Sequence, residues 1–132
     1  MYLLDTDTCI HLARGNEGVL GRLRTHDRTD INLSVLSVYE LELGILKAEK
    51  QVAKKRQALA ELLGLIQIEG FGVDAAREAA KIRAELEKRG EPIGSVDYLI
   101  AGTARLRSWV LVTGNLREFR RVKGLKLETW RV

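Results

Sequence analysis

Five short apolar runs with strand-like composition, separated by helix-like stretches, constrain the fold of this 132-residue chain more than any other feature. The runs are residues 2–4, 31–35, 65–69, 109–113 and 125–130. Strands that alternate with helices are typical of a parallel sheet, because parallel neighbours need crossover connections that cover the faces. The sequence therefore predicts an α/β fold, with a parallel sheet that carries helices on both faces.

Capping residues indicate where the helices begin. The expected helices are 38–50 after Ser37, 75–90 after Asp74 with Gly90 at the end, and a helix from Ser95 or Asp97 that includes 98–107. A short helix at 19–25 and a polar turn are expected within the stretch from 15 to 30. Each of these elements connects two of the apolar runs.

Length and composition favour one compact domain, 1–132, of ordinary globular type. Hydrophobic residues make up 45% and charged residues 30% of the chain, and no apolar run approaches the ~18 residues of a membrane span. The N-terminus enters a strand-like segment with no basic leader before it, which favours the cytoplasm. A lone cysteine, Cys9, agrees with a reducing compartment and suits a small buried residue.

Positive charge gathers in two places. Lys and Arg outnumber Asp and Glu by 22 to 18, with a sequence pI of about 9.4, which favours a polyanionic partner. The clusters are 47–57 and 117–123. We interpret the first as a solvated helix face, since such faces are common.

Four acids lie at or next to the predicted ends of strands and helices: Asp5, Glu40, Asp97 and Glu118. The carboxyl ends of parallel strands share one edge of a sheet, so these side chains can converge there despite their long sequence separations. Carboxylates without His or Cys partners select Mg²⁺ or Mn²⁺ and disfavour zinc. Such a cluster with metal bound supports phosphoryl chemistry, in which the cation generates a nucleophile and stabilises the leaving oxygen.

Each acid also has a structural interpretation. Ser37 and Glu40 are spaced as a capping box, Asn115 and Glu118 imitate one, and Asp97 can simply start a helix. Asp7 is either a partner of Asp5 or the N-cap of the helix that follows, and we favour the cap at the rim of the site. The two histidines, His11 and His26, have no ligand spacing to any acid and are expected to be structural or surface residues.

Four blocks together resemble a known family. They are "LLDTDTCI" (3–10), "SVLSVYELELGI" (34–45), "PIGSVDYLIAGTA" (92–104) and "LVTGNLREFRRVKGLKLETW" (111–130). In this order they resemble the signature blocks of PIN-domain ribonucleases, in particular the VapC-like toxins of toxin–antitoxin pairs. The resemblance spans nearly the whole chain and implies a Rossmann-like parallel sheet of about five strands.

The resemblance also implies the chemistry of the site. It assigns Asp5, Glu40, Asp97 and Glu118 as the catalytic acidic quartet, with Asp5, Asp97 and Glu118 as ligands of Mg²⁺ or Mn²⁺. It assigns Thr6, Asp7, Thr113 and Asn115 as residues lining the site. Glu40 is chosen over Glu42 because the family's glutamate precedes Leu and, four residues on, Gly, which here are Leu41 and Gly44. Two departures are Asp7, where the family usually has Asn, and Gly114 in "VTGN".

The implied activity is metal-dependent endoribonuclease cleavage by the toxin of a toxin–antitoxin pair. The implied partners are an RNA substrate, a cognate antitoxin whose C-terminal segment lies across the active-site groove, and a second copy of the chain in a homodimer. A basic rim would hold the RNA backbone. Its candidate residues are Arg105, Arg107, Arg117, Arg120, Arg121 and Lys123.

Two other functions remain open on the sequence alone. "LLDTDT" also resembles the opening of haloacid-dehalogenase-type phosphatases, with Asp5 as nucleophile and Asp7 as acid/base, but that function leaves Glu40 and Asp97 without a role. A non-catalytic RNA-binding adaptor is the second alternative. Metal-dependent RNA cleavage distinguishes the ribonuclease from both.

Overall fold

The computed structural model describes residues 1–130 and contains one five-stranded sheet. All neighbouring strands are parallel, in the order β3-β2-β1-β4-β5. The strands are β1 (Tyr2–Leu4), β2 (Ile31–Ser34), β3 (Gln67–Glu69), β4 (Val110–Val112) and β5 (Lys126–Glu128). The predicted α/β class and the five strands are therefore confirmed, each strand lying within the run that predicted it.

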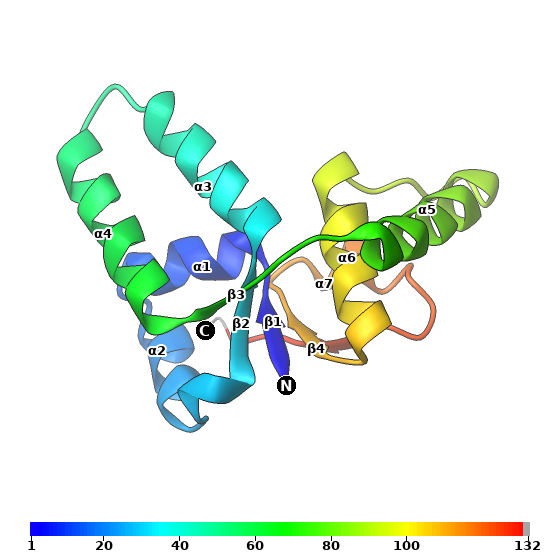
Figure 1. Cartoon of the computed structure of the whole chain (residues 1–132), viewed down its shortest axis with the longest axis horizontal. Coiled ribbons are helices and arrows are strands. Elements are labelled where there is room, and N and C mark those ends of the chain that lie inside the picture. The colour runs from blue at the N-terminus through cyan, green and yellow to red at the C-terminus, as the bar shows by residue number, and fades with distance from the viewer. Residues whose placement is uncertain (131–132) are drawn as a thin grey trace.

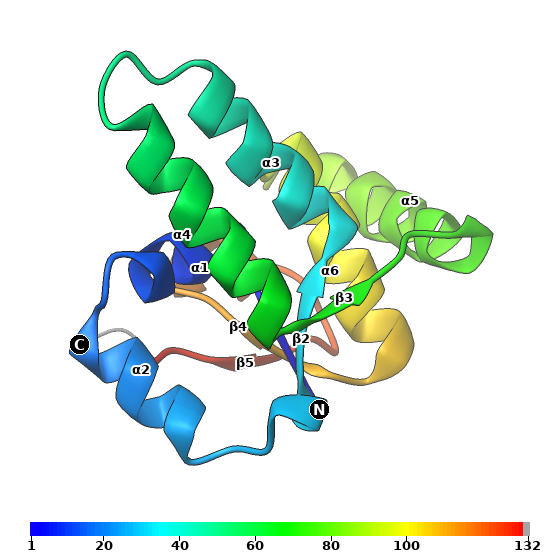
Figure 2. The ribbon, with the colours of Figure 1, turned by 60° about the vertical axis from the view of Figure 1, so that its left-hand side comes forward.

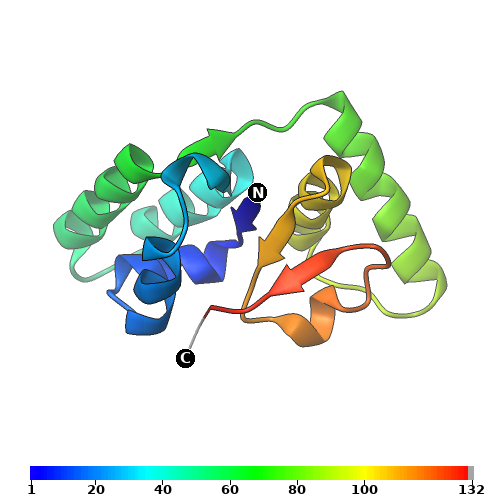
Figure 3. The same ribbon diagram turned by 90° about the horizontal axis from the view of Figure 1, so that it is seen from below.

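Helices lie on both sides of this sheet, as Figures 1 and 3 show. They are α1 (Thr6–Ala13), α2 (Glu17–Arg24), α3 (Val35–Leu46), α4 (Val52–Leu65), α5 (Val73–Lys88), α6 (Ser95–Arg107) and α7 (Leu116–Phe119), with a short 3-10 turn at Arg28–Asp30. The first four helices cover one face and the last three cover the other. None of the helices in the described part is long and apolar enough to cross a bilayer.

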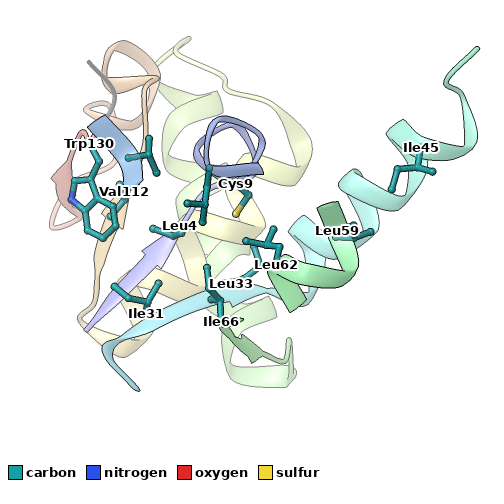
Figure 4. Close-up of a cluster of buried hydrophobic side chains, with 12 residues drawn as sticks. Leu4, Cys9, Ile31, Leu33, Ile45, Leu59, Leu62, Ile66, Val112 and Trp130 are labelled. Carbon is teal, nitrogen blue, oxygen red and sulfur yellow. The ribbon is translucent and has the colours of Figure 1, made fainter. Parts of the chain in front are cut away.

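Each face of the sheet has its own hydrophobic core, because successive side chains of a strand point in opposite directions. Leu4 and Val112 face the core under α1 to α4, which Figure 4 shows, and Leu3 and Leu111 face the core under α5 to α7. Cys9 is fully buried in the first core, as expected. Alternation along β1 and β4 thus fixes which helices sit on which face.

Helix α3 begins three residues earlier than predicted. Ser34, the last residue of β2, caps it by accepting a hydrogen bond from the Leu36 amide (3.0 Å). Ser37 is consequently a buried residue inside the helix and Glu40 lies in its second turn. The prediction that Ser37 caps this helix is therefore wrong, and the alternative of a Ser37–Glu40 capping box is excluded. The chain passes from strand to helix with no loop between them, and the serine at the strand end meets the free amides first.

Two further helix boundaries differ from the prediction. The helix expected over 38–50 ends at Leu46, and α4 starts after Gln51, whose left-handed backbone (φ 58°) turns the chain. The basic cluster 47–57 therefore spans a turn and the start of α4 and is no continuous helix face. Helix α5 starts after Gly72, two residues before the predicted cap Asp74, which lies in its first turn. Figure 2 shows α3 and α4 side by side as an antiparallel pair.

Candidate active site

The four predicted acids meet at the carboxyl edge of the sheet. Asp5 follows β1, Glu40 comes from α3, Asp97 lies in the first turn of α6 and Glu118 belongs to α7, which follows β4. The four carboxylates lie close enough to interact, since the charges of Glu40, Glu118 and Asp5 all raise the pKa of Asp97. The parallel topology thus brings together side chains separated by more than a hundred residues of sequence.

Asp97 is the acid most affected by this clustering. Burial is the main cause, and with the three neighbouring carboxylates it raises the pKa of Asp97 from 3.8 to about 6. Gly94, the residue before α6, makes room for this side chain, since a Cβ there would lie 2.8 Å from Asp97 Oδ2. The Asp97 carboxylate therefore lies close to the backbone of Gly94, and any larger residue at position 94 would require this carboxylate to shift.

Asp5 is held more rigidly than the sequence suggested. Its amide donates to the Val112 carbonyl (3.0 Å) and its Oδ1 accepts from the Thr8 amide (2.8 Å), so Asp5 itself is the N-cap of α1. Burial raises the pKa of Asp5, and hydrogen bonds from Thr113 and Thr8 act against that rise. The carboxylate nearest the sheet is thus fixed by β1, β4 and the start of α1 together.

Asp7 is not the helix cap that we predicted. It lies in the first turn of α1, about half exposed, with Oδ2 3.7 Å from His11 Nε2 one turn along the helix. Asp5 takes the capping role because it is the residue at the strand end, where the free amides of the helix point. Asp7 remains at the rim of the site.

The other predicted lining residues each hydrogen-bond one acid of the quartet. The Thr6 hydroxyl lies 2.5 Å from Glu40 Oε1, and the Thr113 hydroxyl bonds Asp5. Asn115 Nδ2 donates to Glu118 Oε2 (2.9 Å) and makes no side-chain cap to α7. The Asn115–Glu118 pair is therefore no capping box, because the side-chain amide of Asn115 bonds the Glu118 carboxylate and not the backbone of α7.

The charge of this cluster suits a hard divalent cation. No ion pair within residues 1–130 engages Asp5, Glu40, Asp97 or Glu118, so their mutual repulsion is not relieved by the chain's own cations. In that same part of the chain no group of three or more His, Cys, Asp or Glu side chains is arranged so that it could already hold a metal ion. A cation would draw these oxygen ligands together, and the donor set fits Mg²⁺ or Mn²⁺.

The predicted basic rim divides into two groups. Three of its members form ion pairs: Arg105 with Glu78 (2.7 Å), Arg107 with Glu69 (3.0 Å) and Arg121 with Glu91 (4.0 Å). The other three are exposed and have no ion pair within the described range: Arg117, Arg120 and Lys123. Arg105 also donates to the Lys123 carbonyl, which makes it part of the scaffold, and its predicted contact with RNA stays untested.

A groove of about 530 Å³ runs between α1, α3 and α4 and reaches Glu40. Its lining is mostly aliphatic, with Gly44 in the wall beside Glu40. Arg14, Lys54 and Lys55 also line it, and all three are exposed with no ion pair among the described residues. The groove thus extends from Glu40 along aliphatic walls that carry three basic side chains.

Sequence reasoning missed two residues of the site, Ser37 and Gly94. Ser37 is fully buried with its Oγ 2.9 Å from the Thr6 hydroxyl, yet its spacing from Glu40 pointed to a capping box. Gly94 stands three residues before Asp97, and only the fold shows that the carboxylate occupies the space of its missing side chain. A glycine at that spacing before a candidate acid is the signal that could have been noticed.

Comparison with known proteins agrees with the fold. The "PIN domain" family matches residues 2–125, which is nearly the whole chain. The chain therefore belongs to the PIN-domain family, the class to which the parallel sheet and its acidic edge point.

Within that family the similar named proteins are VapC ribonucleases. The chain is 36% identical to "tRNA(fMet)-specific endonuclease VapC" of Salmonella typhimurium (strain LT2), with 98% of this chain and 97% of that one covered. It is 30% identical to "Ribonuclease VapC2" of Rickettsia felis, with 98% of each covered. Its structure matches DNA-bound VapBC from Salmonella typhimurium with a TM-score of 0.91 at 32% identity, covering 98% of this chain and 97% of that one.

Proposed function

We propose that this protein is a metal-dependent endoribonuclease and the toxin of a toxin–antitoxin pair. The observation that carries the proposal is the convergence of Asp5, Glu40, Asp97 and Glu118, uncompensated by any cation of the described chain, at the edge where α/β folds act on ligands. The similarity over 98% of the chain to proteins named VapC supports it. The matched solved structures include VapBC complexes, which supports an antitoxin as partner.

The residues have distinct roles in the proposed reaction. Asp5, Asp97 and Glu118 would hold the Mg²⁺ or Mn²⁺, and the bound cation would activate a water and stabilise the leaving oxygen of the phosphodiester. Asp5 supplies a fixed carboxylate, since its backbone and side chain are both anchored. Asp97 binds a proton below about pH 6 and must release it before the full charge of the site is available. Glu40 completes the cluster from the groove side.

The alternatives drawn from the sequence have less support. A phosphatase of the haloacid-dehalogenase type would need Asp7 as acid/base beside Asp5, whereas Asp7 is about half exposed and near His11. An RNA-binding adaptor would not need four converging carboxylates. An assay of metal-dependent RNA cleavage distinguishes both alternatives from the ribonuclease.

Antitoxin-free protein should cleave RNA only when Mg²⁺ or Mn²⁺ is present. Initiator tRNA is the first RNA to test, because a relative at 36% identity is named for tRNA(fMet). Asp5→Asn and Asp97→Asn should each lower the rate at least ~100-fold while the protein remains folded. Cleavage in excess chelator would contradict the metal role, and tight RNA binding without cleavage would favour the adaptor. Phosphatase activity on p-nitrophenyl phosphate would favour the phosphatase.

The groove between α1, α3 and α4 is the surface that we propose for the antitoxin's C-terminal segment. An amphipathic segment suits it, with apolar side chains on the aliphatic walls, acidic side chains toward Arg14, Lys54 and Lys55, and a basic side chain toward Glu40. Such a segment would cover the site from one side. Binding of the antitoxin segment in the groove would then by itself inhibit RNA cleavage.

A pair of glycine variants tests this placement. Gly44 lines the groove and Gly64 does not, and a Cβ at either position meets no atom within 4 Å. Gly44→Leu should weaken antitoxin binding at least about tenfold, because it fills the groove, whereas the control Gly64→Leu should bind normally. Equal affinities for the two variants, measured by calorimetry with the purified antitoxin, would remove the antitoxin from this groove.

The remaining expectations concern the cell and the assembly. Expression of the chain alone should arrest growth, and Asp5→Asn should relieve the arrest.

We place the protein in the cytoplasm, where its RNA substrate is, and propose a homodimer. Exposed apolar side chains on α3, Tyr39 at 59% and Leu46 at 72%, are available for such an assembly. Light scattering of antitoxin-free protein would check the dimer.

A further inference from the structure

Three side chains from two elements form a chain of hydrogen bonds that ends on the Glu40 carboxylate. Thr6 begins α1 directly after Asp5, and its hydroxyl lies 2.5 Å from Glu40 Oε1 and 2.9 Å from Ser37 Oγ. Ser37 and Glu40 lie three residues apart on α3 and so share one face of that helix. The contact therefore joins the start of α1 to one face of α3.

The number of hydrogens fixes the direction of this chain. An ionised carboxylate only accepts, so the single hydrogen of the Thr6 hydroxyl is donated to Glu40. The contact with Ser37 must then use the hydrogen of Ser37, with Thr6 accepting. Hydroxyls that donate in series polarise one another, and the last bond, to a charged oxygen, is the strong and directional one.

A second buried hydroxyl shows what a purely structural role looks like in this protein. Thr103 in α6 is 1% exposed and donates to the Leu99 carbonyl four residues back, the usual bond of a hydroxyl inside a helix. Ser37, equally buried, is bonded across to α1 instead. Its hydroxyl is thus committed to a residue of the site.

We propose that Ser37 is a positioning residue of the ribonuclease site, which acts through the Thr6 hydroxyl to fix the Glu40 carboxylate near Asp97. Thr6 is a reliable anchor because the preceding residue is tied to β4 by its amide and to α1 by its side chain. With Glu40 Oε1 engaged by Thr6, Oε2 is the carboxylate oxygen that this contact leaves available. This inference rests on the proposed function for the role of Glu40, while the hydrogen-bonded chain itself is a property of the structure.

Four substitutions separate positioning from packing. Ser37→Ala and Ser37→Cys should each lower kcat for RNA cleavage about tenfold with KM unchanged, because Cys keeps the volume but is a weak donor. Ser37→Thr keeps the hydroxyl and should retain more activity than Ser37→Cys. The matched control Thr103→Val removes the other buried hydroxyl and should leave kcat and KM unchanged. A packing role predicts the reverse order, with Cys near wild type and Thr impaired.

A double-mutant cycle tests whether Ser37 acts through Thr6. Ser37→Ala added to Thr6→Val should cost no further activity, whereas independent roles would make the two losses multiply. Mn²⁺ binding without RNA gives a readout apart from catalysis, and the dissociation constant should rise in Ser37→Ala and Ser37→Cys but not in Thr103→Val. Thermal unfolding of each variant identifies any that fails to fold.

Each outcome has a definite meaning. Wild-type kcat in Ser37→Ala, full activity in Ser37→Cys, or multiplied losses in the cycle would overturn the inference. If wild-type protein bound no Mn²⁺ and cleaved no RNA, the proposed function would fail instead. In that case the proposed role of Ser37 would fall with it, and the two failures remain distinguishable because the first leaves wild-type binding and cleavage intact.

Discussion

Two pairs of neighbouring helices, α5 with α6 and α3 with α4, differ in how tightly they pack. Helices α5 and α6 approach so closely that a Cβ on Gly102 would lie 2.8 Å from both the Cβ and the backbone nitrogen of Ala79. Helices α3 and α4 leave a groove of about 530 Å³ between themselves and α1, and Gly44 faces open space there. The ion pairs differ too, since Arg105–Glu78 is about one-fifth exposed and Arg56–Glu42 is 40–49% exposed.

Each pair contributes one acid to the site, and the difference suggests two duties. Asp97 sits on α6 of the closed pair, where rigid packing holds a carboxylate whose pKa is raised to about 6. Glu40 sits on α3 of the open pair, where the groove leads away from the site. The closed pair packs tightly, and the open pair leaves the groove that we propose for the antitoxin.

Glycine-to-alanine substitutions should give the largest contrast between the pairs. Gly102→Ala forces a methyl group into the backbone of α5 and should lower the free energy of unfolding by about 3 kcal/mol. Gly44→Ala meets no neighbour and should raise it by roughly 0.5–1 kcal/mol, through helix propensity. Denaturant unfolding of both variants measures the difference. Equal effects would mean that α5 and α6 can separate without cost.

The two ion pairs should differ in the same direction but by less. Arg105→Met leaves Glu78 partly buried without its partner and should cost about 2 kcal/mol of stability. Arg56→Met breaks an exposed pair and should cost ~0–1 kcal/mol. The same variants test the predicted RNA rim, because a scaffold role for Arg105 predicts unchanged RNA affinity in the folded fraction. A loss of RNA affinity without loss of stability would restore Arg105 to the rim.

The sequence was sufficient for the fold class because five apolar runs alternate with helices, and a parallel sheet is the arrangement that buries them all. Position at element ends and family resemblance also selected four acids that the structure brings together, and their role in the reaction stays a prediction. Local patterns failed where two residues compete for one role. Ser34 and Ser37 both precede helix-like residues, as Asp5 and Asp7 do, and only the register of the strand end decides which one caps.

The contacts that hold the acids could not be predicted for a related reason. Thr6 meets Glu40 across 34 residues of sequence, and Thr113 meets Asp5 from the far end of the chain. Nothing local to either residue encodes that distance. The same applies to Gly102, whose contact with Ala79 exists only because α5 and α6 cross there.

The pH dependence of stability should reveal the site itself, with an effect of about 1 kcal/mol after solvent screening. The pKa of Asp97 is raised in the folded state, so the folded protein binds the proton more tightly than the unfolded chain. Its contribution to stability is therefore present below about pH 4 and lost as the pH rises to about 6. Metal-free wild type should lose more stability over that interval than Asp97→Asn. Identical profiles would show that Asp97 is not among like charges.

Calorimetric titration of Mn²⁺ into antitoxin-free protein at pH 6, in two buffers of different ionisation enthalpy, tests most directly whether the four acids form one cation site. With a pKa of about 6, Asp97 is half protonated at that pH, so binding should release about half a proton. Asp97→Asn should bind Mn²⁺ more weakly and without this release. Binding of the same strength and proton balance in wild type and Asp97→Asn would contradict the account.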